Sequence, residues 1–188
     1  MLRNCKRFIL GGSSPYIYSL NPMFLETGVV IGLNQWPKYG FRQDLWLCVD
    51  SDIAMRDYPD IVNGVSELKY MQRYKHMEKL PPADYFFEKS GDEIPLIWEE
   101  RLSWSCTCAT AAANLAVILG ATEIVLYGVD LSNDGRADGT QYDEGHNWDT
   151  KVDMVNKWFH RLTHESDVLV YKTNPASPLN LPLYKWVR

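Results

Sequence analysis

The stretch ATAAANLAVILGATEIVLYGVDL, residues 109–131, predicts a helix that is followed at once by a buried strand. Its first half is rich in small and apolar residues and stops at Gly120, a residue typical of helix ends. Its second half holds the continuously apolar run 124–129, which breaks at Asp130. A strand without polar alternation is covered on both faces, and this favours parallel pairing.

Similar apolar runs recur along the chain and alternate with helical patterns. We expect further strands over residues 6–10, 29–33, 45–49 and 167–171. We expect helices over 107–119 and over 150–164, where apolar residues recur close to helical spacing. This alternation predicts an α/β fold with a single doubly wound, mostly parallel sheet and helices on both faces, as in Rossmann-like proteins.

The length of the chain, 188 residues, fits a single nucleotide-binding domain over 1–188. Residues 53–103 are less regular than the rest, and we expect this insertion to hold helices and a segment that faces an acceptor substrate. Residues 67–79 carry several basic side chains and are expected to form a solvated helix face.

Composition narrows the classes of partner. The 19 Lys and Arg residues against 24 Asp and Glu residues give a formal net charge of −5, which argues against a broad electrostatic contact with nucleic acid. No apolar run approaches the roughly 20 residues of a membrane helix, so we expect no membrane span. The four cysteines lack the paired C-x-x-C spacing of a zinc site, and we expect reduced thiols and a cytoplasmic location. An exposed helix face leaves room for a homo-oligomer.

Polar and flexible residues follow the expected strands, at the edge where open parallel sheets bind ligands. After the first strand comes Gly11-Gly12-Ser13-Ser14, whose glycines allow close backbone approach and whose amides and hydroxyls suit a phosphate. A plain tight turn is the alternative. After the second strand comes Asn34, whose amide can read a base, a ribose or a sugar, or form an Asx-turn. Trp36, Trp104 and Trp148 also follow strand ends, where a ring can stack on a base or sugar.

Carboxylates follow two other expected strands, and the start of a helix is a further candidate site. Asp50 and Asp52 suit a divalent ion that neutralises a diphosphate, or they cap the next helix. Asp130 follows the strand 124–129 and is a further candidate for ligand contact. Thr107 and Cys108 open a helix whose free amides favour an anion, while the small residues behind them allow close packing on the sheet.

The loop after Asp130 is long and rich in glycine and charge, which is typical of functional or mobile loops. It carries Tyr142 and also His146, which comes just before the helix expected from residue 150. An imidazole with a near-neutral pKa suits a general base that takes a proton from an acceptor hydroxyl. A structural or surface histidine is the alternative.

Taken in order, these motifs resemble one superfamily. It includes the bacterial sialyltransferases of glycosyltransferase family 42 and the 6-hydroxymethylpterin diphosphokinase-like proteins (domain of unknown function 115). ILGGSSPYI (9–17) is similar to the family's first strand and G-x-G-P-S-type turn, and VVIGLNQWP (29–37) to its second strand, which ends in Asn-Gln. Residues 109–131 are similar to its helix, Leu-Gly and E-I-x-L-x-G-x-D block. YDEGHNWDTKVDMVNKW (142–158) resembles the segment with the sialyltransferase general base, and VYKTNPASPL (170–179) the closing strand and turn.

The resemblance implies roles for individual residues. The implied nucleotide contacts are Gly11, Gly12, Ser13 and Asn34, with Thr107 and Cys108 on the helix that faces the nucleotide. Tyr142 is implied to lie near the leaving phosphate, and His146 to be the base. The sequence departs from the family where the turn reads GGSSP, where Cys108 replaces a serine, and where Asp50 stands in place of an asparagine. An acidic residue at position 50 suits the kinase-like branch or a metal-assisted reaction.

We therefore expect a glycosyltransferase-like transferase that moves a sugar from a nucleotide-activated donor to an acceptor hydroxyl. His146 would act as general base, and Tyr142 would help the leaving group. The alternative is a diphosphokinase that uses ATP on a hydroxymethyl substrate, with Mg²⁺ held by Asp50 and Asp52. A second alternative is a nucleotide-binding module without catalysis. Metal dependence separates the first two hypotheses.

Overall fold

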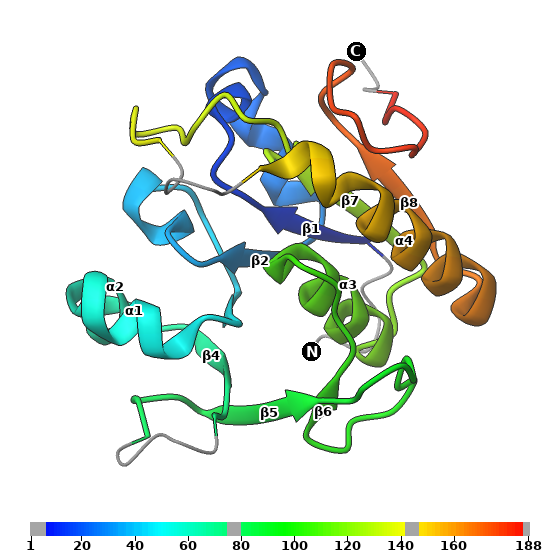
Figure 1. Cartoon of the computed structure of the whole chain (residues 1–188). Coiled ribbons are helices and arrows are strands. Elements are labelled where there is room, and N and C mark those ends of the chain that lie inside the picture. Colours follow the sequence, from blue (N-terminus) through cyan, green and yellow to red (C-terminus); the bar gives the residue numbers. More distant parts are fainter. Residues whose placement is uncertain (1–6, 75–79, 142–146, 186–188) are drawn as a thin grey trace.

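A computed structural model describes residues 7–74, 80–141 and 147–185, in which eight strands form one sheet (Figure 1). Neighbouring strands follow the order β6-β5-β4-β3-β2-β1-β7-β8, and each of these pairs is parallel. The strands are β1 (Arg7–Gly11), β2 (Val29–Leu33), β3 (Leu45–Cys48), β4 (Leu68–Gln72), β5 (Tyr85–Lys89), β6 (Arg101–Leu102), β7 (Glu123–Tyr127) and β8 (Leu169–Lys172). The expected doubly wound, Rossmann-like α/β sheet is confirmed.

Successive side chains of the central strands enter two different cores, because side chains alternate across a strand. Phe8 and Leu10 belong to the larger core, and Ile9 between them belongs to the opposite one. The larger core lies beneath α3 (Cys108–Ile118) and α4 (Val152–Ser166). The opposite face is covered by short elements: η2 (Pro15–Ser19), η3 (Pro22–Thr27), η4 (Trp36–Tyr39), α1 (Ser51–Asp57) and α2 (Pro59–Gly64). Helices therefore cover both faces, as expected.

The two long helices differ in how they meet the sheet. α3 is buried from Cys108 to Ala116, because its many alanines let it lie close to the strands below and to α4. α4 is amphipathic and buries one stripe, Val155, Trp158, Phe159 and Leu162. η5 (Trp148–Thr150) leads into α4. Both helices lie within two residues of their expected bounds.

The helix expected over 67–79 is wrong where β4 occupies Leu68–Gln72, and residues 75–79 lie outside the described residues. Tyr70 and Met71 enter different cores, so the strand buries both of its faces, while polar residues such as Lys69 hide that pattern in the sequence. Residues 53–103 also contribute β5 and β6, and these extend the sheet at one edge. The helices expected in this segment lie at its start, in α1 and α2, whereas its three strands were not expected.

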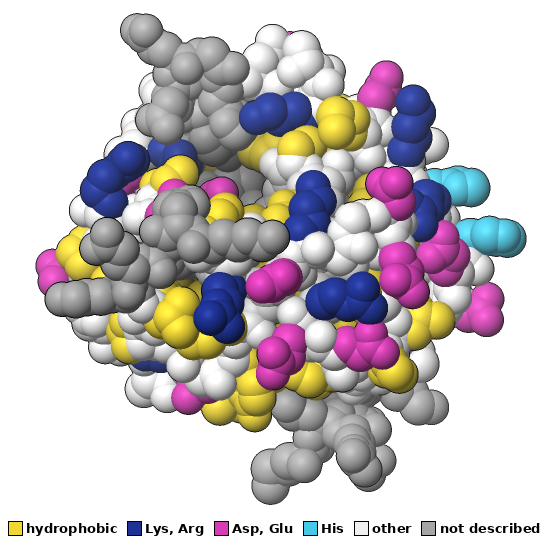
Figure 2. Space-filling view, turned by 60° about the horizontal axis from the view of Figure 1, so that its bottom comes forward, with side chains coloured by type: hydrophobic (Ala, Val, Ile, Leu, Met, Phe, Trp, Pro, Cys, Tyr) yellow, Lys and Arg dark blue, Asp and Glu magenta, His cyan; other side chains and the backbone are white. Residues whose placement is uncertain are grey.

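The surface carries intermixed charges on the face that Figure 2 shows, where Lys and Arg side chains alternate with Asp and Glu among hydrophobic side chains. Among the described residues on this face, Lys and Arg do not form a broad, continuous positive surface that would attract a polyanion. None of the helices in the described ranges combines the length and the hydrophobicity that a membrane crossing requires.

The order of the strands reverses at β1, which has β2 on one side and β7 on the other. From β1 the chain proceeds outward to β6, and it then returns to add β7 and β8 on the other side. Where connections leave in opposite directions, a crevice forms beyond the carboxyl ends of the two strands. The segments at this point follow Gly11 and Tyr127.

Candidate functional site

A cavity of about 800 Å³ lies at the crevice between β1 and β7, within the range of small-molecule sites. Its walls come from the segments after β1, β2, β3 and β7, from the start of α3, and from the junction of α1 and α2. The residues predicted from the sequence that line it are Gly12, Ser13, Ser14, Asn34, Asp50, Thr107, Cys108 and Asp130. Gly11 and Asp52 are not part of the lining, and Tyr142 and His146 lie outside the described residues.

The glycines after β1 bring backbone segments into contact. A Cβ on Gly12 would lie 2.4 Å from the carbonyl oxygen of Gly128, and one on Gly11 would lie 2.6 Å from the ring of Trp36. The N–H of Gly12 donates to Tyr127 O (2.9 Å), and the N–H of Ser14 donates to Gly128 O (2.9 Å). The close approach that these glycines permit is therefore to β7 and to Trp36, and it fixes the turn at the cavity wall.

Asp130 connects the turn after β1 to the turn after β8. Its Oδ2 accepts hydrogen bonds from Ser14 Oγ and from Asn174 Nδ2, the latter at 2.8 Å. Its backbone carbonyl accepts from Ser177 Oγ at 2.9 Å. The residue is only 3 % exposed. Burial raises the pKa of Asp130 above its usual value, and the hydrogen bonds from Ser14 and Asn174 oppose this rise.

This environment gives the stability a defined pH dependence. The pKa of Asp130 is higher in the folded than in the unfolded protein. The contribution of Asp130 to the free energy of unfolding is therefore fully present below the unfolded pKa near 3.8, and it is lost as pH rises through the folded pKa. We expect Asp130→Asn to keep both hydrogen bonds and to gain stability relative to wild type between pH 4 and pH 7. We expect Asp130→Ala to lose about 2 kcal/mol at pH 4, because Ser14 and Asn174 lose their acceptor. Its deficit should be smaller at pH 7, because only wild type loses stability as the carboxyl ionises. Urea unfolding at both pH values measures this, and equal pH dependence in wild type and Asp130→Asn would contradict it.

Asn34 and Cys108 meet where β2 and α3 point at the cavity. Asn34 has a left-handed backbone (φ 48), and the indole Nε1 of Trp46 donates to its carbonyl oxygen at 2.8 Å. Its side-chain Oδ1 accepts from the thiol of Cys108 at 3.1 Å. Thr107 caps α3, since its Oγ1 accepts from the N–H of Ala109 at 3.3 Å. The start of α3 thus presents a capped helix end beside an oriented amide.

Asp50 lies at the N-cap of α1, and its carbonyl accepts from the N–H of Ala54 at 2.8 Å. Burial and the charge of Asp52 raise its pKa, while Lys151 opposes the rise. Among the residues that the structure describes, no three His, Cys, Asp or Glu side chains gather into a metal-binding group. A Mg²⁺ site on Asp50 and Asp52 stays a prediction, with only Asp50 in the cavity wall.

Three basic residues of the lining, Lys38, Arg136 and Lys151, were missed by sequence reasoning. Lys38 Nζ lies 2.5 Å from Asp138 Oδ2, and the N–H of Ala137 donates to Ser13 O at 2.7 Å. These contacts fasten the loop after β7 to η4 and to the turn after β1. Lys151 lies over the ring of Trp148, which also lines the cavity. Two of these residues could have been predicted from their neighbours in the sequence. Lys38 follows Asn34 closely, and Arg136 belongs to the long loop after Asp130.

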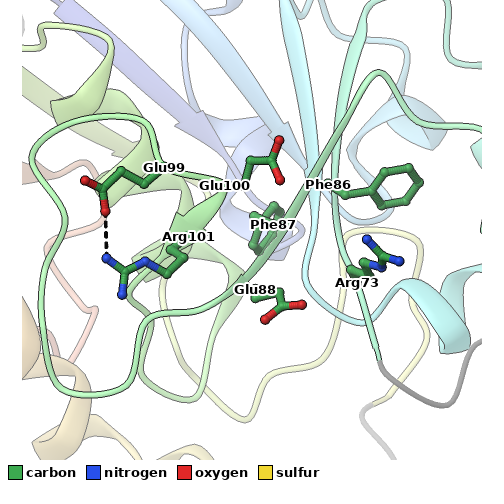
Figure 3. Close-up of a pocket in the computed structure, with 7 residues that line it drawn as sticks. All are labelled: Arg73, Phe86, Phe87, Glu88, Glu99, Glu100 and Arg101. Carbon is green, nitrogen blue, oxygen red and sulfur yellow. Dashed lines mark hydrogen bonds and ion pairs between the residues drawn. The ribbon is translucent and has the colours of Figure 1, made fainter.

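A second, smaller cavity of about 270 Å³ lies at β4, β5 and the start of β6 (Figure 3). Phe86 and Glu88 line it together with Arg73, and on the other side Arg101 donates to Glu99 at 2.6 Å. None of the site residues predicted from the sequence lines this cavity. The crevice between β1 and β7 is therefore the candidate site.

The fold and the site together define a doubly wound parallel α/β protein with a polar cavity at its topological switch point, a class that binds small molecules there. No protein-family model and no curated protein sequence matches the chain. Among solved structures, the sialyltransferase CST-II, in complex with trisaccharide acceptor and CMP, aligns with a TM-score of 0.61 and 16% identity. The alignment covers 96% of this chain and 86% of that one. CstII from Campylobacter jejuni with the substrate analogue CMP-3FNeuAc aligns over the same shares with a TM-score of 0.42 and 11% identity. The alignment with CST-II, at a TM-score of 0.61, shows that the chain has a sialyltransferase-like fold.

Proposed function

We propose that this chain is a glycosyltransferase-like enzyme that transfers a sugar from a nucleotide-activated donor to an acceptor hydroxyl. The observation that carries the proposal is that polar residues after four parallel strands and at the start of α3 line one cavity. The likeness in fold to a sialyltransferase crystallised with CMP and a trisaccharide acceptor supports the same reaction class. The nucleotide sugar is a substrate in this proposal, and the reaction needs no further cofactor.

We place the phosphate of the donor between the turn after β1 and the start of α3. Ser13 offers its hydroxyl and its backbone amide on one side. The N-terminal amides of α3 behind Thr107 favour an anion on the other side, because the helix dipole is positive there. Arg136 lines the same cavity and adds positive charge, whereas the charge of Lys38 is paired with that of Asp138. The nucleoside then extends along the wall formed by Asn34.

We place the acceptor at the end of the cavity that the junction of α1 and α2 forms. This junction belongs to residues 53–103, the segment expected to face an acceptor. Tyr58 and Asp60 line this end, and so does Asp57, whose carboxylate is paired with Arg56. A carboxylate such as that of Asp60 suits the hydroxyl groups of a sugar, because it accepts hydrogen bonds from several donors. This placement separates donor and acceptor within a single cavity.

We assign the general base to His146 and assistance of the leaving phosphate to Tyr142. Asn147, which follows His146 in the chain, caps η5 by accepting from the N–H of Asp149 at 2.9 Å. The next residue, Trp148, donates its N–H to Asn133 Oδ1 at 3.0 Å and lines the cavity. The residues that directly follow His146 in the sequence are therefore anchored at the cavity wall.

Ligand-induced stabilisation tests the proposal directly. At about 100 times its dissociation constant, a bound nucleotide adds roughly 2.7 kcal/mol to the stability, which raises Tm by about 5 °C or more in a domain of this size. We expect such a rise with CMP, a CMP-activated sugar or another nucleotide sugar, and release of free nucleotide when a hydroxyl acceptor is added. The absence of any shift across a panel of nucleotides and nucleotide sugars would contradict the proposal.

The nucleotide-release assay, repeated in EDTA and with Mg²⁺, separates the alternatives. A transferase of the proposed kind keeps its activity in EDTA, whereas loss of activity in EDTA and recovery with Mg²⁺ would favour a diphosphokinase. A nucleotide-binding module without catalysis would show the shift in Tm and form no product with any donor and acceptor.

A further inference from the structure

Asn34 is fixed in place by its backbone before its side chain makes any contact. Its N–H donates to Leu47 O at 3.2 Å, and its carbonyl accepts from the indole of Trp46 at 2.8 Å. The left-handed backbone, with φ of 48, directs the chain away from β2 at this residue. The Cα–Cβ bond of Asn34 therefore has one direction, toward the cavity that the residue lines.

The orientation of the Asn34 amide follows from counting protons at Cys108. The sulfur of Cys108 accepts from the N–H of Val49 at 3.4 Å, and that backbone group can only donate. The single thiol proton is then available for Asn34 Oδ1, which lies 3.1 Å from the sulfur. Burial and the charge of Asp50 raise the pKa of the thiol to about 12, so the proton stays in place near neutral pH.

Once Oδ1 is committed to the thiol, the amide nitrogen is the polar atom that remains on a side chain lining the cavity. An amide nitrogen is a donor of two hydrogen bonds and accepts none. No residue in the described part of the chain accepts a hydrogen bond from this nitrogen, although Asn34 is half-buried. This donor is therefore available to a ligand in the cavity.

We infer that Cys108 is a positioning residue, which holds the Asn34 amide so that its Nδ2 donates to an acceptor oxygen or nitrogen of the bound nucleotide. The inference rests on the proposed function for the identity of the ligand. It goes beyond that function by defining what the wall at Asn34 recognises, which is a hydrogen-bond acceptor such as a ribose oxygen or a base carbonyl. A ligand that offers only donors at this point would be rejected, because two donors would then face each other.

Binding of CMP to four variants tests the inference by isothermal titration calorimetry. Cys108→Ala removes the proton donor and should weaken CMP binding about fivefold to tenfold. Cys108→Ser keeps a donor and should stay within about twofold of wild type. Asn34→Ala should weaken binding at least as much as Cys108→Ala. In the double variant, Cys108→Ala should add less than twofold to the effect of Asn34→Ala, because the thiol acts through the amide. Additive losses would overturn the positioning role.

A measurement without ligand separates failure of this inference from failure of the proposed function. The side-chain amide of Asn34 should give a rigid ¹⁵N relaxation signature in free wild type and in Cys108→Ser, and a mobile one in Cys108→Ala. A mobile amide in free wild type would overturn the inference whether or not nucleotides bind. A rigid amide in a protein that binds no nucleotide would instead support the positioning role and contradict the proposed function.

Discussion

Alanine at Gly128 should destabilise the protein by about 3 kcal/mol. Gly128 has φ of +70, a left-handed conformation that costs an L-residue about 1 kcal/mol or more. The added Cβ would also lie 2.0 Å from Ile17 Cγ2, in a buried core where overpacking costs a further ~1–3 kcal/mol. The carbonyl oxygen of Gly128 accepts from the N–H of Ser14, so a shift of the backbone would also disturb the turn at the cavity.

Gly40 provides a matched control for this substitution. Its φ of +72 is almost the same, and nothing lies within 4 Å of the position that a Cβ would occupy. Gly40→Ala should therefore cost only the conformational part, about 1 kcal/mol. Urea unfolding of both variants isolates the steric part as their difference. Equal destabilisation by the two substitutions would show that β7 and η2 can separate at no cost.

The sheet could be predicted where strands are apolar on both faces. β2 and β7 are such strands, and the expected runs match them to within two residues at each end. β4 and β5 lie nearer the edge of the sheet, where the first residue of β4 and most of β5 are exposed. Charged residues such as Lys69 and Glu88 interrupt these strands, so their sequences lack the continuous apolar pattern. The prediction failed there because burial decreases toward the edge.

The candidate site was predictable in part, because one rule relates sequence to position in space. The rule that ligands bind at the carboxyl ends of parallel strands brought Ser13, Asn34 and Asp130 together before their contacts were known. The rule says nothing of contacts between distant loops. Lys38 and Asp138 are 100 residues apart, and their ion pair depends on how η4 and the loop after β7 meet. Such pairs carry no periodic signal in the sequence.

Alanine at His146 should lower the turnover number by about 10²- to 10⁴-fold, the usual contribution of a general base. The affinity for nucleotide should change by less than about twofold, because we propose that the imidazole meets the acceptor hydroxyl rather than the donor. Release of free nucleotide from the nucleotide sugar measures turnover, and calorimetry with CMP measures affinity. His160 lies exposed on α4 and is not part of the cavity lining, so it offers a matched control. His160→Ala removes an imidazole outside the site and should retain full activity.

The pH profile distinguishes a base from a structural histidine at position 146. A neutral imidazole is required for proton transfer, so wild-type activity should fall on the acidic side of the profile, as the base becomes protonated. The residual activity of His146→Ala should lack this acidic limb, because the imidazole then no longer limits the reaction. A histidine that only supports the fold would lower activity and leave the limb in place. Turnover equal to wild type would remove His146 from the mechanism, and the base would then have to be sought among the carboxylates of the cavity wall, where burial raises the pKa of Asp50.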